Sequence, residues 1–138
     1  MSGIVVRLQQ RIDIVITAPA NGTIVQIPAA RRVDCSQFQH GVVIARLHTG
    51  TSFVANQTIQ FQYAPDPFTD EDPNQNWSGT NATLLTTFTG GTDGAPNSKT
   101  GNLVEPFTGL LMFYWFFNFT VATQMKVSLS ADLHLKGT

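Results

Sequence analysis

The stretch Leu110-Leu111-Met112-Phe113-Tyr114-Trp115-Phe116-Phe117-Asn118-Phe119 decides the fold, because it is apolar without a break from Leu110 to Phe117. A helix that spans a membrane needs about 20 apolar residues, so this run is too short to cross a bilayer. Its aromatic content and its short, bounded length favour a β-strand over a segment of buried helix.

Side chains alternate along a strand, so the run has two faces. One face suits the core of a domain and comprises Leu111, Phe113, Trp115, Phe117, Phe119 and Val121. The other face comprises Leu110, Met112, Tyr114 and Phe116, and it turns polar only at Asn118 and Thr120. This second patch also needs cover, from another part of the chain or from another molecule, so its four apolar residues are candidate partner-binding residues.

Other segments show strand patterns of different kinds. The last one alternates most strictly, with apolar Met125, Val127, Leu129, Ala131, Leu133 and Leu135 separated by polar residues. It predicts a strand with one face on the core and one wet face. Gly41–His48 alternates little, which predicts a central strand covered on both faces, whereas Ile59, Phe61 and Tyr63 alternate with polar residues and predict a half-exposed strand.

Turn and loop residues separate these segments. Asn21-Gly22 predicts a tight turn between two apolar runs. Ala64–Gly79, with three prolines and four acidic residues, is predicted to be a long loop, and Ala82–Phe88 returns to a strand pattern. Thr89–Gly101 is rich in Gly, Asn, Asp and Pro and lacks hydrophobic anchors, so it is predicted to be a second loop, mobile or held by a neighbour.

About eight short strands with two long loops predict an all-β protein, an antiparallel β-sandwich. A jelly roll fits this strand count best, although the pattern does not determine the order of the strands. At 138 residues, we expect residues 1–138 to form a single domain.

The composition is poor in charge. Charged residues make up 12% of the chain, against roughly 25% in average soluble proteins. The formal net charge of −1 gives no overall attraction to phosphate backbones, so nucleic-acid binding is not expected. Low charge also removes the self-repulsion that keeps proteins apart, which suits a subunit of a homo-oligomer or a larger assembly.

The beginning of the chain lacks the basic start and the long apolar core of a signal peptide. We therefore expect synthesis and folding in the cytoplasm, with no membrane partner. Cys35 is the only cysteine, which leaves no disulfide framework and no cysteine-based zinc site.

No catalytic motif is evident. His40, His48 and His134 are scattered, and ordinary surface or strand-end roles are expected for them. Cys35 lies five residues before His40, but no orienting residue and no glycine-rich oxyanion motif accompanies the pair, so Cys35 is expected to be a small buried side chain. We expect neither enzymatic activity nor a cofactor.

Two charged segments are candidates for binding. The loop Asp66-Pro67-Phe68-Thr69-Asp70-Glu71-Asp72-Pro73 has three interpretations: oxygen ligands for Ca²⁺, a solvated acidic loop, or a docking loop for a basic partner surface with Phe68 as apolar anchor. Its spacing matches no known calcium loop. Arg31-Arg32, the only adjacent basic pair, is expected to form surface salt bridges or to meet acidic residues of a neighbouring subunit.

Aromatic side chains suggest a different class of ligand. Trp77 lies in the acidic loop region and is a candidate platform for stacking against a sugar ring, whereas Trp115 lies on the face predicted to be core. A carbohydrate-binding β-sandwich module is therefore the alternative hypothesis.

Residues 32–38, Arg32-Val33-Asp34-Cys35-Ser36-Gln37-Phe38, lead into the strand Val42–His48, and Ala64-Pro65 later precedes Asp70-Glu71-Asp72-Pro73. This region, about residues 30–75, resembles small jelly-roll proteins from tailed-bacteriophage structural gene clusters, in particular capsid cement or decoration proteins.

The resemblance implies a structural virion protein rather than an enzyme. Cement proteins bind the outside of an expanded phage head where subunits of the major capsid protein meet, commonly as dimers or trimers, and carry no catalytic residues. Some of them use an extended terminal arm. Here the last strand runs almost to Thr138, so contacts are expected from the sheet faces and the two loops.

Overall fold

The computed structural model describes residues 3–66, 83–104 and 109–137. These residues form eight strands: β1 (Ile4–Thr17), β2 (Thr23–Asp34), β3 (His40–Thr49), β4 (Gln57–Pro65), β5 (Thr83–Thr89), β6 (Asn97–Asn102), β7 (Leu110–Phe119) and β8 (Gln124–Lys136). The described part of the chain contains no helix that is long and apolar enough to span a membrane.

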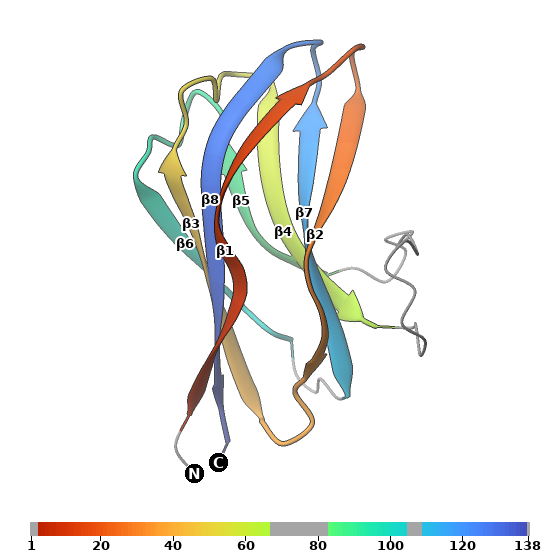
Figure 1. The fold of residues 1–138 in the computed structure, drawn as a ribbon, viewed down its shortest axis with the longest axis vertical. Helices are drawn as coiled ribbons and strands as arrows, with labels where there is room; N and C mark the ends of the chain where they lie inside the picture. Colours follow the sequence, from red (N-terminus) through yellow and green to blue (C-terminus); the bar gives the residue numbers. More distant parts are fainter. Residues whose placement is uncertain (1–2, 67–82, 105–108, 138) are drawn as a thin grey trace.

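The strands form two four-stranded antiparallel sheets packed face to face (Figure 1). The strand order is β1-β8-β3-β6 in one sheet and β2-β7-β4-β5 in the other. Every connection except the one between β4 and β5 therefore passes from one sheet to the other. This is the arrangement of a jelly roll, which confirms the predicted all-β antiparallel sandwich and supplies the strand order that the sequence pattern left open.

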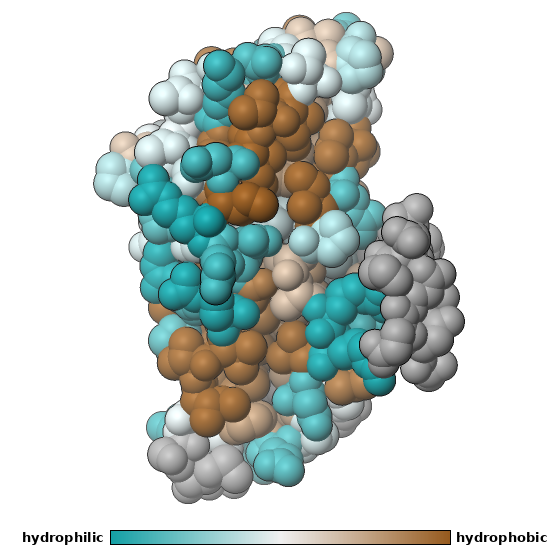
Figure 2. All heavy atoms as spheres, in the orientation of Figure 1, coloured by the Kyte–Doolittle hydropathy of each residue, from teal (hydrophilic) through white to brown (hydrophobic). Residues whose placement is uncertain are grey.

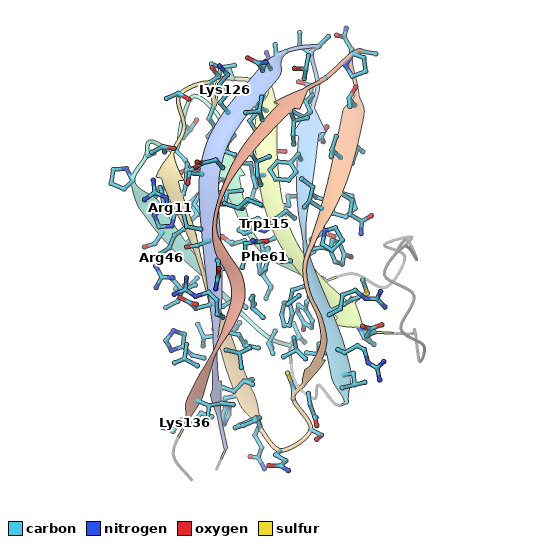
Figure 3. All side chains as sticks on the ribbon, in the orientation of Figure 1. Arg11, Arg46, Phe61, Trp115, Lys126 and Lys136 are labelled. Carbon is cyan, nitrogen blue, oxygen red and sulfur yellow. The ribbon has the colours of Figure 1, made fainter. Side chains whose placement is uncertain are left out.

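The odd-numbered face of β7, from Leu111 to Phe119, lies in the core as predicted, but Val121 lies beyond the end of the strand and is 41% exposed, so its assignment to the core is wrong. Phe113, Trp115 and Phe117 are fully buried between the sheets. The Phe61 ring on the neighbouring strand β4 lies with its centroid 4.3 Å from that of Trp115. Figure 3 shows these two side chains between the sheets. Across the core, the apolar face of β8 is equally closed, with Leu129 fully buried.

The outer face of β8 differs from the prediction, because its middle is not wet. Ser128 is 0% exposed, Ser130 is 2% exposed and Asp132 is 7% exposed. Strand β8 lies between β1 and β3, and long side chains from both neighbours cover these three residues. The predicted alternation of apolar and polar residues in β8 is confirmed, but the polar residues in its middle are buried.

The expectation for the segment Gly41–His48 is also corrected on one face. This segment lies in β3, which is central between β8 and β6, and its inner residues Val43, Ala45 and Leu47 are buried. Its outer residues are only half-buried, because no further layer of the described chain lies over them.

The predicted second loop is wrong for its last residues, because β6 occupies residues 97–102 and pairs along its length with β3. Apolar alternation does not reveal this strand, because Lys99 and Gly101 occupy its inward positions. A Cβ atom at Gly101 would lie 2.3 Å from the Leu85 carbonyl oxygen, so only glycine allows this close approach of the two sheets. The Lys99 ammonium donates instead to the Thr87 carbonyl, at 2.9 Å.

The strands β1 and β2 lie at one open side of the sandwich, each with an unpaired edge. Large apolar side chains remain exposed there, among them Ile12 on β1 and Ile24 on β2. Figure 2, which views this side, shows two apolar groups with hydrophilic side chains between them. Register shifts in both strands and Pro28 in β2 interrupt the edges, which disfavours the addition of another strand.

Candidate functional site

The apolar patch on β7 lies on the outer face of the β2-β7-β4-β5 sheet, and most of it is covered within the chain. Tyr114 is 0% exposed and Met112 is 3% exposed. Together with Ala64 they form a small second hydrophobic cluster, against which Phe116 packs. Leu110 and Phe116 are half-buried, so they retain the accessible surface of the patch.

Neighbouring strands flank this patch with short or neutral side chains. Pro28 of β2 and Gln62 of β4 lie opposite Tyr114 on its two sides. The Gln62 amide donates to the side-chain oxygen of Gln60, at 2.8 Å. Among the described residues on the outer face of β7, β4 and β5, no side chain is ionised except Asp66, which follows the end of β4. A partner on this face would therefore contact amide groups and the edges of aromatic rings.

The basic pair Arg31-Arg32 organises one end of the same sheet. Arg31 Nη2 lies 3.1 Å from Asp66 Oδ1, and the Asp66 side chain is fully buried. The second oxygen of Asp66 accepts a hydrogen bond of 3.1 Å from the backbone N–H of Arg32, which has a positive φ of 56°. The Asp66 carboxylate thus ties the end of β4 to the bulge in β2. Arg31 therefore pairs within the chain, with a carboxylate that is buried rather than at the surface, and a role of the basic pair in partner binding stays a prediction.

Five candidate residues lie outside the described residues: Phe68, Asp70, Glu71, Asp72 and Trp77. The docking loop, the cation site and the sugar platform therefore stay predictions. Within the described residues, no group of three His, Cys, Asp or Glu side chains is placed to hold a metal ion.

The other sheet carries a polar cluster that the sequence analysis did not single out. On the outer face of β1-β8-β3-β6, the Asp132 carboxylate forms ion pairs with two arginines. Arg46 Nη1 donates to Asp132 Oδ2 at 2.7 Å, and the Arg7 guanidinium contacts Oδ1. The Asp132 side chain is only 9% exposed, because the two arginine side chains lie over it.

Two buried hydroxyl groups extend the cluster along β8. Arg11 Nε donates to Ser128 Oγ at 2.9 Å, and His48 Nε2 lies 2.8 Å from Ser130 Oγ. Burial lowers the pKa of His48 below its usual 6.5, and the positive charges of Arg11, Arg46 and Arg7 lower it further. The imidazole is therefore neutral at pH 7, and the three guanidiniums carry the positive charge of the cluster.

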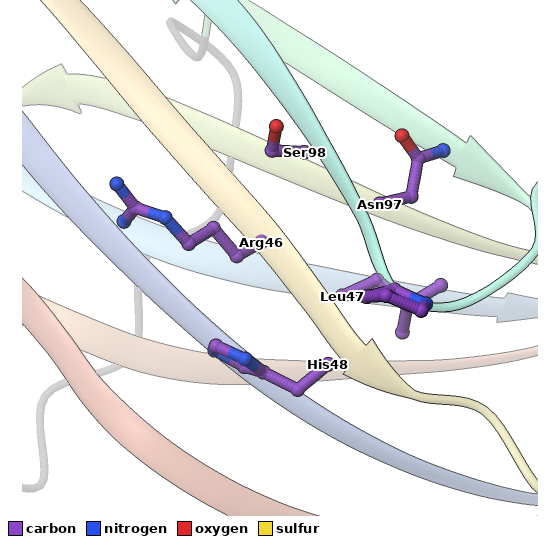
Figure 4. Close-up of a pocket in the computed structure, with 6 residues that line it drawn as sticks. Arg46, Leu47, His48, Asn97 and Ser98 are labelled. Atoms are coloured by element: carbon purple, nitrogen blue, oxygen red, sulfur yellow. The ribbon is translucent and has the colours of Figure 1, made fainter.

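A shallow hollow of about 400 Å³ lies beside this cluster (Figure 4). Its lining residues are Arg46, Leu47, His48, Pro96, Asn97 and Ser98. Strand β6, which the sequence pattern failed to predict, supplies its far wall. The hollow offers hydroxyl and amide groups next to the Arg46 guanidinium, a combination suited to a polar, negatively charged ligand.

A signal for this cluster existed in the sequence. Arg46 and His48 are two residues apart on one strand, and Arg7 and Arg11 are four apart on another, so each pair shares a face. Asp132 stands among the polar positions of the last strand. Only the strand order β1-β8-β3 shows that all five side chains belong to one face.

Cys35 has the properties of a structural residue. It is 0% exposed, and burial, with a smaller contribution from the negative charge of Asp34, raises the pKa of its thiol to about 11. A nucleophilic cysteine needs the opposite shift. The buried position predicted for it from the sequence is confirmed.

No family model matches the sequence, and no curated protein matches it. Solved structures do match. The VP2 subviral particle of infectious bursal disease virus is 16% identical, with a TM-score of 0.56, over 97% of this chain and 32% of that chain. The T=1 particles derived from the same virus give 14% identity and a TM-score of 0.58, over 97% and 31%.

The Gx strain of infectious bursal disease virus gives 15% identity and a TM-score of 0.57, over 97% of this chain and 32% of that chain. The chain shares a jelly-roll fold with the matched part of these proteins. It spans about a third of the length of the chains that it matches. At this level of identity the likeness concerns the fold, and function is argued separately below.

Proposed function

We propose that this protein is a structural, non-enzymatic component of a virus particle. One observation carries the proposal: the jelly roll matches over 97% of the chain a domain of a protein that forms T=1 and subviral particles. A fold supports many functions, so the match is support by analogy. The low charge of the chain and the burial of Cys35 agree with an assembly role.

The finer form of the proposal is a capsid cement protein of a tailed bacteriophage. It rests on the resemblance of residues 30–75 to such proteins. In this role the protein binds the major capsid protein on the outside of the head, as a dimer or trimer, after synthesis in the host cytoplasm. The partly exposed Leu110 and Phe116, exposed Arg32 and the segment 67–82 are the surfaces that we assign to these contacts.

Sedimentation tests both forms. The purified chain is centrifuged alone, then with expanded and with unexpanded phage capsids. A cement protein is expected to co-sediment with expanded capsids and to remain a small oligomer by itself. Particles formed by the chain alone would support the virion role and contradict the cement role. A strictly monomeric chain with no affinity for any capsid tested would contradict both.

Replacement of residues 68–81 by a short Gly-Ser linker tests the docking loop. We expect loss of capsid binding with an unchanged thermal transition, and normal binding would refute the role of this segment. A deletion of Thr89–Gly101 cannot serve as the parallel test, because it removes most of β6, the edge strand that pairs with β3. The matched control is Thr92→Ala, an exposed position in the connection before β6.

The alternative hypothesis, a carbohydrate-binding module of a phage tail or accessory protein, depends on Trp77. This residue lies outside the described residues, and no observation on the described residues favours the alternative. Glycan-array binding that disappears in Trp77→Ala would restore it.

A further inference from the structure

The outer face of the β1-β8-β3-β6 sheet is strongly cationic for a chain of this composition. Its positively charged residues are Arg7, Arg11, Arg46, Lys126 and Lys136. Its acidic residues are Asp13 and Asp132. Five of the chain's eight cationic residues therefore lie on one face with two of its nine acidic residues, an excess of three positive charges on a chain whose net charge is −1. Figure 3 labels four of these cations on or beside this sheet.

The three arginines keep most of their hydrogen-bonding capacity. A guanidinium has five N–H donors in a planar fork. Within the described residues, Arg7 and Arg46 each bond only to Asp132, and Arg11 bonds only to Ser128. The side chains of Arg7 and Arg46 are 53% and 35% exposed, so their unused donors face solvent.

The bound carboxylate of Asp132 shows which chemistry this cluster recognises. Two guanidiniums hold its two oxygens, one from β1 and one from β3. Arg11 lies on the same face and has no acidic partner among the described residues. The hollow lies beside Arg46, which lines it. The cluster thus has room and donors for further carboxylates, which guanidinium forks bind in bidentate geometry.

An acidic peptide fits this face better than a nucleic acid does. Arg7 and Arg46 already hold a side-chain carboxylate, and the net charge of −1 gives the whole chain no overall attraction to a phosphate backbone, which binds through many charges at once. Asp132 repels any anion placed between Arg7 and Arg46, so the carboxylates of the peptide would bind beside it, to the guanidinium donors that face solvent.

We propose that Arg7, Arg11 and Arg46 form a docking site for an acidic peptide segment of a partner protein. The inference goes beyond the proposed virion role and names the chemistry of one partner surface. It is tested on the isolated chain, so its failure leaves the capsid sedimentation result unaffected.

The probe is a hexaglutamate peptide with blocked ends and a fluorescent label, measured by fluorescence anisotropy against the same peptide made of glutamine. At 50 mM NaCl we expect hexaglutamate to bind at least tenfold more tightly than hexaglutamine. Raising the salt to 500 mM should weaken binding by about tenfold or more, because exposed charge pairs are screened. Equal affinity for the two peptides would overturn the proposal.

Variants locate the site. Arg46→Gln and Arg11→Gln are each expected to weaken hexaglutamate binding at least fivefold. Arg11→Gln leaves both ion pairs of Asp132 intact, so it tests binding even if Arg46→Gln lowers stability. Lys126→Gln is the matched control: it removes one charge from the same face at a side chain that pairs with none of Asp132, Ser128 and Ser130, and should change the affinity less than twofold. A loss in Lys126→Gln equal to that in the arginine variants would show diffuse attraction and overturn the site.

A single-stranded twelve-thymidine oligonucleotide supplies the competing outcome. Tighter binding of this oligonucleotide than of hexaglutamate, with loss in Arg11→Gln, would assign the face to nucleic acid and overturn the proposal. Weak oligonucleotide binding that is unchanged in Arg11→Gln supports it.

Discussion

The outer faces of β7 and β8 can be compared directly, because each belongs to a central strand and each is buried in its middle. Strand β7 lies between β2 and β4, and its outer face is closed by apolar packing around Tyr114. Strand β8 lies between β1 and β3, and the middle of its outer face is closed by guanidinium groups over Asp132 and Ser128 and by the His48 imidazole at Ser130.

The difference teaches that polarity along a strand does not report exposure in a two-layer fold. An apolar outer face looked in need of a partner, yet Met112 and Tyr114 are buried within the chain. A polar outer face looked wet, yet Ser130 and Asp132 are buried as well. A central position does not by itself bury an outer face, since the outer residues of the central strand β3 are only half-buried; what decides burial on β7 and β8 is the side chains that lie over them.

The largest effect is expected at Tyr114, where the apolar cover can be broken. Because this side chain is as inaccessible as those of the core, Tyr114→Ala should lower the free energy of unfolding by about 3–5 kcal/mol. Urea denaturation of purified variants measures this.

The matched control is Phe116→Ala, on the same face but only half-buried, for which about 1–2 kcal/mol is expected. A loss of less than 1 kcal/mol in Tyr114→Ala would show that this face is open in solution, and would return the patch to the candidate partner surfaces.

A smaller effect is expected where the polar cover is broken. Asp132→Asn removes the carboxylate charge shared by Arg7 and Arg46, so the free energy of unfolding should fall by about 1–3 kcal/mol. Asp13→Asn, an exposed acid on the same sheet, should change it by no more than about 0.5 kcal/mol. Equal effects of the two substitutions would mean that the ion pairs over β8 contribute nothing specific.

The smallest effect concerns the pH dependence of the polar face. The pKa of His48 is lowered in the folded protein, by burial first and then by Arg11, Arg46 and Arg7, so the unfolded chain takes up its proton at a higher pH. The stabilisation by neutral His48 is fully present above pH 6.5 and is lost as the pH falls below that value towards the lowered pKa.

Wild-type protein should therefore lose more stability between pH 7.5 and pH 5 than His48→Gln does, as measured by urea denaturation in matched buffers. Arg11→Gln removes one of the charges that face the imidazole and should give an intermediate slope. Identical slopes for the wild type and His48→Gln would contradict the assigned environment of His48.

The alternation of β7 and β8 was enough to predict the sandwich, because a period of two marks the inward side of a strand whatever its partners are. Strand β6 could not be found in this way. Its inward positions are filled by Lys99, whose ammonium reaches the Thr87 carbonyl, and by Gly101, which lies against the Leu85 backbone. The two sheets approach each other closely at Gly101, so β6 carries no apolar side chain at this position. Inward apolar side chains were the signal on which the prediction relied.

The binding surfaces were harder to predict than the fold. The cover over Ser128 depends on register shifts in β1 that place Arg11 above it, and a sequence pattern does not give such shifts. The pairing of Arg31 with Asp66 joins residues 35 apart in sequence. Long-range geometry of this kind comes only from the strand order. The acidic residues 70–72 and Trp77 lie outside the described residues, so their roles stay predictions.

The pairing of β1 with β8 places Ile4 opposite Leu135, at one end of the sandwich. Figure 1 shows the start of β1 and the end of β8 there, while the β1–β2 and β7–β8 turns lie at the opposite end. Joining Lys136 to Ile4 through a short linker and opening the chain at the Asn21-Gly22 turn would keep every strand pair. The same geometry means that a reporter attached next to Ile4 or next to Lys136 lies at the same end of the domain, and leaves the turn end free for attachment to a surface.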